Sequence, residues 1–265
     1  MRIILAALLT FTLSGCVTNN VNTEISLKKA GYLFRDNLYT NTNIITKGDL
    51  STFQGIEFVK KTTIRWWDRR KQTASAFDKS TFKVFVFKAK FIKGNTIIIR
   101  VNAEFKTKNQ AEEQAIKYAK SIGRLPNFLR TKNLKTITIH KGKARLGGGN
   151  NDLLIHINGF GENNNLEEVL MHEAGHTTLD PQWKGSVNRR QWNEAAKSDN
   201  KFISKYARQF PKREDIAETI NWWIAVRCKS DRISAHHYKQ IIKSIPNRLK
   251  YLDEQKFDTY PLVCK

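Results

Sequence analysis

The stretch His172-Glu173-Ala174-Gly175-His176 decides how this sequence is interpreted. On a helix, side chains four positions apart lie on one face, so the two imidazoles point to the same place and the Glu173 carboxylate lies beside the first. Two histidines at this spacing with an adjacent glutamate are typical of a catalytic zinc site. We therefore expect His172 and His176 to bind Zn²⁺ and Glu173 to act as a general base.

The residues around this stretch favour a helix. Asn165 can cap its start, and Glu168, three positions later, can complete a capping box. The apolar residues between Leu166 and Leu170 supply a buried stripe that leads to the histidines. Pro181 is expected to end the helix.

The preceding sequence predicts strands. Apolar residues dominate 82–87 and 96–101, and Lys93-Gly94-Asn95 between them is a hairpin signal. Residues 108–122 are typical of a helix, and 136–139 and 153–157 predict two further strands, joined through a glycine run (147–149) that we expect to be a flexible loop. This order predicts an α+β fold: a small mixed sheet, then the metal-binding helix and C-terminal helices. A sheet edge near Ile157 would offer a cleft to an extended peptide.

The first sixteen residues have the features of an export signal. An apolar run from Ile3 to Leu13 has the length of a signal-peptide core and is too short to span a membrane as a mature helix. Leu13-Ser14-Gly15-Cys16 resembles a bacterial lipobox, which implies removal of residues 1–15 and lipid attachment to Cys16. Val17, which is not acidic, then implies sorting to the outer membrane. An ordinary secretory leader is the alternative.

These features divide the chain into a signal peptide (1–15), a tether and N-terminal region (16–80), and a catalytic domain (81–265). Export would make Cys228 and Cys264 available for pairing in an oxidising compartment. We expect a disulfide between them that ties the C-terminal tail to the second active-site helix. Two separate buried thiols are the alternative.

The chain is strongly basic, with a formal net charge of +22. This charge predicts attraction to anionic lipid, lipopolysaccharide or acidic cell-wall polymers. The densest basic stretch, residues 60–71, includes Trp66 and Trp67, and aromatic residues beside arginine can stack on bases. In an exported protein, a solvated or membrane-facing surface is favoured over nucleic-acid recognition.

Two histidines leave a catalytic zinc ion one protein ligand short. A metzincin extension would need Gly at 179 and His or Asp at 182, and the chain has Leu179 and Gln182. Glu194 would be the third ligand of a thermolysin-like site. Its expected partner Asp199, however, lies five positions away and off its helical face.

The other candidates for the third ligand are Glu214 and Glu218. Pro211 suits the first turn of a helix, on which the two glutamates lie one turn apart, so one can bind metal while the other orients a histidine. With the two-histidine motif, this Glu-x-x-Ala-Glu arrangement resembles the gluzincin metallopeptidases related to anthrax lethal factor. The resemblance implies a zincin-like fold and hydrolysis of peptide or protein substrates. It also implies that Glu214 binds Zn²⁺, that Glu218 supports the site and that Tyr206 assists catalysis.

Asp180 lies four residues beyond His176 and can accept the free N–H of that imidazole, or it can serve as a cap. His140 and His156 have no such spacing and are expected to be ordinary surface or strand histidines. Two other functions stay open. One is a catalytically silent, lipid-anchored zinc-binding protein, against which the intact Glu173 argues. The other is a hydrolase of peptidoglycan cross-links, although no wall-binding repeat is visible.

Overall fold

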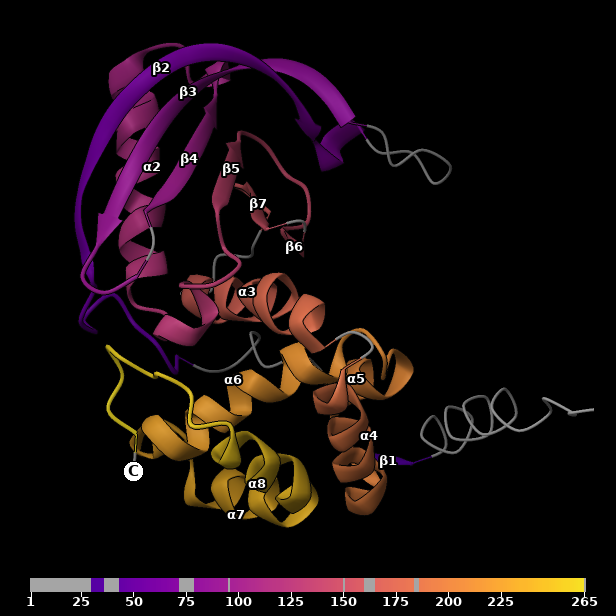
Figure 1. Cartoon of the computed structure of the whole chain (residues 1–265). Coiled ribbons are helices and arrows are strands. Elements are labelled where there is room, and N and C mark those ends of the chain that lie inside the picture. Colours follow the sequence, from indigo (N-terminus) through magenta and orange to yellow (C-terminus); the bar gives the residue numbers. More distant parts are fainter. Residues whose placement is uncertain are drawn as a thin grey trace, which may run out of the picture.

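The computed structural model describes residues 30–35, 43–71, 79–94, 96–149, 151–159, 165–183 and 186–264. Within these ranges the chain forms a curved mixed sheet followed by a group of helices, so the predicted α+β class is confirmed. In Figure 1 the sheet lies at the top, α3 crosses the middle and the C-terminal helices lie below. Cys16 and the expected leader fall outside the described residues.

The main sheet has the strand order β2-β3-β4-β5-β7-β6 in the described part of the chain. Its strands are β2 (Phe53–Trp67), β3 (Lys79–Phe91), β4 (Ile97–Asn102), β5 (Thr136–His140), β6 (Gly147–Gly149) and β7 (Asp152–His156). β3 is antiparallel to both β2 and β4. β4, β5 and β7 run parallel to one another, and β6 runs antiparallel to β7. A separate pair is formed by β1 (Gly31–Phe34) and β8 (Lys201–Ser204), which are parallel.

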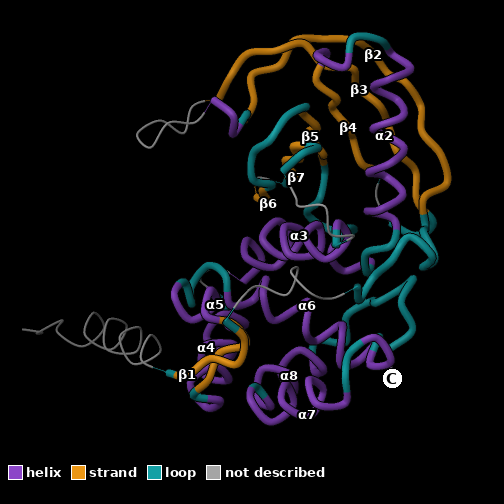
Figure 2. The backbone as a smooth tube through the Cα atoms, turned by 180° about the vertical axis from the view of Figure 1, so that it is seen from behind, coloured by secondary structure: helices purple, strands orange, loops and turns teal. Residues whose placement is uncertain are grey.

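The hairpin predicted around residue 94 is confirmed as the β3–β4 connection. Lys93 and Gly94 both have positive φ, 51° and 114°, which is a conformation that glycine adopts without strain. After β4 the chain forms α2 (Lys108–Gly123), which starts at Thr107, whose side chain accepts a hydrogen bond from the backbone N–H of Gln110. Figure 2 shows α2 lying along β2, β3 and β4.

β2 departs most from the expected organisation. It lies in the region 16–80, which we expected to be a tether and N-terminal region, yet it pairs with β3 along nearly all of its length. Within the described residues β2 has a strand neighbour on one side only, and most of its residues are at least partly exposed, so its sequence lacks a buried stripe. The boundary expected between residues 80 and 81 falls within β3, and therefore inside the sheet.

The glycine run also differs from what the sequence predicts. Residues 147–149 form a strand and not a flexible loop, and among the described strands the sheet edge beside α3 belongs to β6, because β7 lies between β5 and β6. A Cβ atom on Gly148 would lie 1.8 Å from the carbonyl oxygen of Glu173. Glycine therefore allows the edge strand to approach the backbone of the predicted metal-binding helix.

The helices after the sheet are α3 (Leu166–Trp183), α4 (Val187–Asp199), α5 (Lys205–Gln209), α6 (Asp215–Cys228), α7 (Ala235–Ser244) and α8 (Pro246–Glu254). Short 3₁₀ turns are η2 (Arg69–Lys71), η3 (Ala103–Phe105), η4 (Asn127–Leu129) and η5 (Ser230–Arg232). One apolar core extends from the α2-covered face of the sheet through α3 into the C-terminal helices.

α3 lies between the sheet and α6 (Figure 1). It continues to Trp183, so the expected stop at Pro181 is wrong. Glu168 does not form the expected capping box. Its buried Oε1 instead accepts hydrogen bonds from the backbone N–H groups of Ile44 and Ile45, and the Ile45 nitrogen lies 3.2 Å from this oxygen. This carboxylate fastens a distant N-terminal segment to α3, one turn before His172.

Candidate metal centre

Two imidazole nitrogens and one carboxylate oxygen converge between α3 and α6. His172 Nε2 and His176 Nε2 lie 3.1 Å apart, and Glu214 Oε2 lies 3.3 Å from the first and 3.0 Å from the second. The two histidines are those of the sequence motif, and Glu214 is the candidate third ligand that the family resemblance implies; the group can hold a metal ion. Ligand atoms about 2.0–2.2 Å from a tetrahedral zinc ion are about 3.3–3.6 Å from one another. The observed triangle is close to this size.

Glu214 reaches the histidines from the start of α6. The helix begins at Asp215, later than the turn expected at Pro211, and Glu214 is its N-cap residue without a side-chain capping bond. Asp215 fixes this end of the helix, because its buried carboxylate accepts hydrogen bonds from Trp192 Nε1 at 2.9 Å and Arg248 Nε at 3.0 Å. The Glu214 carboxylate is thus available to the histidines.

A carboxylate lies beside the outer nitrogen of each imidazole. His176 Nδ1 is 2.8 Å from Asp180 Oδ2, and His172 Nδ1 is 3.3 Å from Glu218 Oε1. An ionised carboxylate can only accept a hydrogen bond, so this arrangement favours a proton on each Nδ1 and a lone pair on each Nε2. The lone pairs then face the shared centre, as metal binding requires.

Two further residues hold these carboxylates, and the sequence does not reveal them. Arg189 Nη2 donates to Asp180 Oδ1 at 3.0 Å. Ser204 Oγ donates to Glu218 Oε2 at 2.7 Å while accepting a hydrogen bond from the backbone N–H of Ala207. A serine before a helix signals a cap, but nothing in the local sequence indicates that its hydroxyl also reaches a glutamate on the next helix.

The electrostatics favour positive charge at the centre of the group. Burial opposes ionisation of Glu214, but hydrogen bonds and charge interactions with the two histidines hold its pKa well below the usual range. Burial alone would lower the pKa of His176, but the carboxylates of Asp180 and Glu214 raise it to about 10. A metal cation would compete with protons for these same ligands.

Glu173 follows the first histidine on α3 and is partly buried. Its charge contributes to the raised pKa of His176, so the carboxylate lies within electrostatic reach of the group. Its backbone carbonyl is the atom against which Gly148 of β6 packs. The predicted base is therefore located where the edge strand meets α3.

Tyr206 and Arg213 are further neighbours of Glu214, besides the two histidines. Burial raises the pKa of the Tyr206 hydroxyl, the charge of Glu214 adds to this effect, and Arg213 opposes it. Arg213 Nε donates to Glu214 Oε1 at 2.8 Å. Tyr206, which the family resemblance suggests, is thus beside a predicted ligand, and Arg213 is a neighbour that the motif alone does not indicate.

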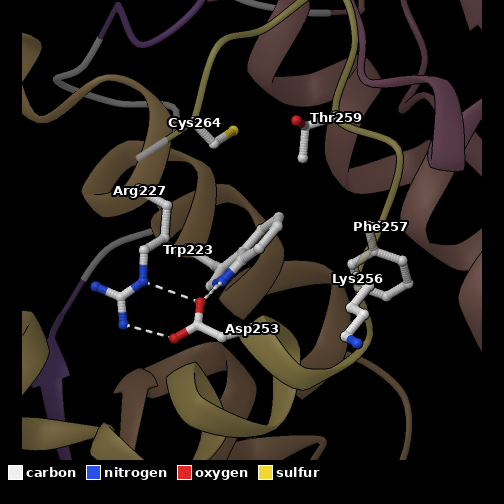
Figure 3. Close-up of a pocket in the computed structure, with 7 residues that line it drawn as sticks. All are labelled: Trp223, Arg227, Asp253, Lys256, Phe257, Thr259 and Cys264. Carbon is white, nitrogen blue, oxygen red and sulfur yellow. Dashed lines mark hydrogen bonds and ion pairs between the residues drawn. The ribbon is translucent and has the colours of Figure 1, made fainter.

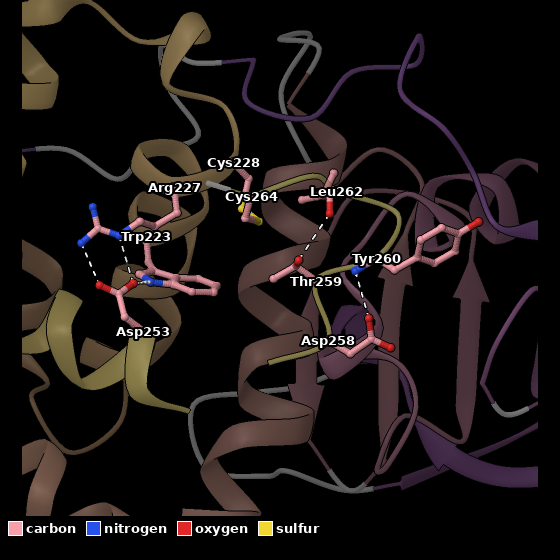
Figure 4. Close-up of a disulfide and its surroundings, with 9 residues drawn as sticks. All are labelled: Trp223, Arg227, Cys228, Asp253, Asp258, Thr259, Tyr260, Leu262 and Cys264. Atoms are coloured by element: carbon pink, nitrogen blue, oxygen red, sulfur yellow. Dashed lines mark hydrogen bonds and ion pairs between the residues drawn. A yellow bond between two sulfur atoms is a disulfide. The ribbon is translucent and has the colours of Figure 1, made fainter. Parts of the chain in front are cut away.

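The thermolysin-like alternative is not assembled. Glu194 is exposed on α4 and lies outside the group, and Asp199 is buried in an ion pair with Arg248 at 3.0 Å. Cys228 and Cys264 form a disulfide, the pairing expected from the sequence, at the end of α6 opposite Glu214. Figure 4 shows this bridge joining α6 to the C-terminal tail.

Asp68, His140 and His156 form a second group of potential ligands, and all three are buried. The histidines are therefore neither surface residues nor isolated: they are partners on β5 and β7 and their rings stack 5.0 Å apart. Both oxygens of Asp68 already bind the Arg70 guanidinium, at 2.7 and 2.9 Å. His140 Nε2 lies 3.0 Å from the carbonyl oxygen of Trp67. Arg70 supplies the cation of this group, which makes it a buried structural network.

A small pocket lies near the disulfide, at the C-terminal half of α6 (Figure 3). Its lining residues are Trp223, Arg227, Asp253, Lys256, Phe257, Thr259 and Cys264. Asp253 is held there by hydrogen bonds from Trp223 Nε1 and Arg227. None of the predicted catalytic or metal-binding residues lines this pocket.

Comparison with models of protein families, with curated proteins and with solved structures found no match for this chain. Across the residues that the structure describes, no helix combines the length and apolar character needed to cross a membrane.

Proposed function

We propose that this protein is a zinc-dependent metallopeptidase with a zincin-like fold, related in its site to the gluzincins. The convergence of His172, His176 and Glu214 carries the proposal. Two imidazoles and one carboxylate form a ligand set of catalytic zinc that leaves a fourth position for water or substrate, whereas structural zinc is bound by four protein ligands. Calcium and magnesium prefer sites built from oxygen atoms alone.

The residues around the group have complementary roles in hydrolysis. Bound zinc would acidify a water molecule and polarise the substrate carbonyl. Glu173 takes the proton of the attacking water and delivers it to the departing amide nitrogen. The Tyr206 hydroxyl donates a hydrogen bond to the carbonyl oxygen as negative charge develops there. Asp180 and Glu218 keep the imidazoles in orientation.

The edge of β6 that pairs with no other described strand is the proposed site for an extended peptide. A peptide that adds to this edge by main-chain hydrogen bonds would pass beside α3, because Gly148 holds β6 against the Glu173 backbone. The substrate class is therefore a peptide or an extended segment of a protein.

We further propose that the enzyme acts in the bacterial cell envelope, held at the outer membrane by lipid on Cys16. Membrane fractionation of a Cys16→Ser variant tests this: the variant should be released into the soluble fraction. Retention of the variant in the membrane would contradict the lipid anchor without affecting the proposed chemistry.

The proposed activity is tested by comparing zinc-loaded wild-type protein with Glu173→Gln and Glu194→Gln on a mixture of peptides, with cleavage measured by mass spectrometry. Glu173→Gln should keep its zinc and lose at least ~10³-fold in rate, because only the base is removed. Glu194→Gln, altered at an exposed site, should match the wild type. A wild type that binds zinc and cleaves nothing would instead support the catalytically silent zinc-binding protein.

A further inference from the structure

Arg213 is a solvent-exposed residue that contacts Glu214, one of the three predicted metal ligands. The two carboxylate oxygens of Glu214 have different partners. Oε2 faces both histidines, while Oε1 accepts a hydrogen bond from Arg213 Nε at 2.8 Å. The guanidinium also interacts electrostatically with Tyr206, the proposed donor to the substrate carbonyl. Arg213 is therefore next to both a predicted zinc ligand and a predicted catalytic residue.

Although it contacts a buried carboxylate, Arg213 is open to solvent. Its side chain is 67% exposed, whereas that of Glu214 is 5% exposed. The guanidinium also lies over the ring of Phe210, with its Cζ 5.1 Å from the ring centroid. A guanidinium has five N–H donors, and the hydrogen bond from Nε to Glu214 uses only part of this capacity. Arg213 is thus fixed in position and can still bind an anion.

The surroundings of Arg213 would attract negative charge. The segment 205–213, which leads to Glu214, contains no Asp or Glu and four basic residues: Lys205, Arg208, Lys212 and Arg213. Two of the carboxylates near the metal group already have cationic or histidine partners: Asp180 pairs with Arg189 and His176, and Glu218 lies beside His172. With a net charge of +22, the whole protein would steer anionic peptides toward this surface.

We infer that Arg213 binds a carboxylate of the substrate, within one or two residues of the scissile bond, and so selects acidic peptides. This inference rests on the proposed peptidase function, because it concerns the choice of substrate. Peptide binding can nevertheless be measured without hydrolysis. A planar guanidinium suits a carboxylate because it can form two parallel hydrogen bonds with it. The carboxylate can come from an Asp or Glu side chain or from the C-terminus of the peptide.

The test measures peptide binding to zinc-loaded Glu173→Gln protein, in which the proposed base is absent. Matched acetylated peptides carry Glu or Gln at one position, each with a free or an amidated C-terminus. Binding should be roughly 10- to 100-fold tighter when the recognised carboxylate is present. Adding Arg213→Gln should remove this difference, and Arg213→Lys should restore part of it. Lys250→Gln, at an exposed residue of α8 that has no part in the proposed site, should leave the difference unchanged.

The peptide series identifies the source of the carboxylate. A Glu-dependent difference indicates an acidic side chain, and a difference confined to free C-termini indicates a terminal carboxylate. Equal binding of all four peptides overturns the inference. So does a uniform loss of binding and zinc affinity in Arg213→Gln, which would mean that Arg213 only orients Glu214. If binding depends on Arg213 but the wild type cleaves nothing, the inference holds and the proposed hydrolysis fails.

Discussion

Replacing Gly148 with alanine should separate β6 from α3. The added Cβ would lie 1.8 Å from the carbonyl oxygen and 2.6 Å from the carbonyl carbon of Glu173, whereas ordinary contact begins at 3.4 Å. The strand and helix would have to move apart by about 1.6 Å (3.4 minus 1.8 Å). Overpacking costs about 1–3 kcal/mol, and we expect the upper end because both obstacles are backbone atoms. This corresponds to a fall in melting temperature of roughly 6–12 °C.

Gly55→Ala is the matched control, because a Cβ at Gly55 has no atom within 4 Å. It should change the free energy of unfolding by less than about 0.5 kcal/mol. Both variants are compared with the wild type by thermal and urea unfolding, with and without zinc. If Gly148→Ala is as stable as Gly55→Ala, the close approach of β6 and α3 is wrong.

Three further predictions address the metal group and the fold. Glu214→Ala should weaken zinc affinity by several kcal/mol while Glu194→Ala leaves it unchanged, as measured by competition with a chelator at one pH; the opposite result would favour the thermolysin-like ligand set. Arg248→Met should cost about 3–5 kcal/mol in urea unfolding because it leaves two buried aspartates unpaired, whereas exposed Lys250→Met should cost little; equal effects would contradict the buried network. Burial lowers the pKa of His140 to about 4, so its ring stays neutral in the fold while the unfolded chain takes up a proton below about pH 6.5. Stability should therefore fall as the pH drops, by about 2 kcal/mol at pH 5, and His140→Gln should remove this part of the pH dependence in urea titrations.

Local patterns were sufficient for the elements with strong periodicity and for the metal motif. The helix over 108–122, the hairpin around Gly94 and the two later strands match α2, the β3–β4 pair, β5 and β7 within a few residues. The spacing of His172 and His176 specifies a shared helical face, and the family resemblance pointed to Glu214, which the structure brings to the same place.

The remaining features depend on contacts between distant segments. β2 has no buried stripe of its own and is defined by pairing with β3, while the glycine run of β6 is defined by the nearness of Glu173. Likewise, Ser204 resembles an ordinary cap until the fold brings its hydroxyl to Glu218. Arg213 resembles an ordinary surface arginine until the fold brings its neighbour Glu214 to the two histidines. Such roles have no local signal.

The central claim is most directly tested by X-ray diffraction from crystals of the zinc-loaded protein, with data collected on both sides of the zinc absorption edge. We expect one strong anomalous peak per chain, about 2.0–2.2 Å from His172 Nε2, His176 Nε2 and Glu214 Oε2. A peak beside Glu194 or among Asp68, His140 and His156, with none between α3 and α6, would contradict it.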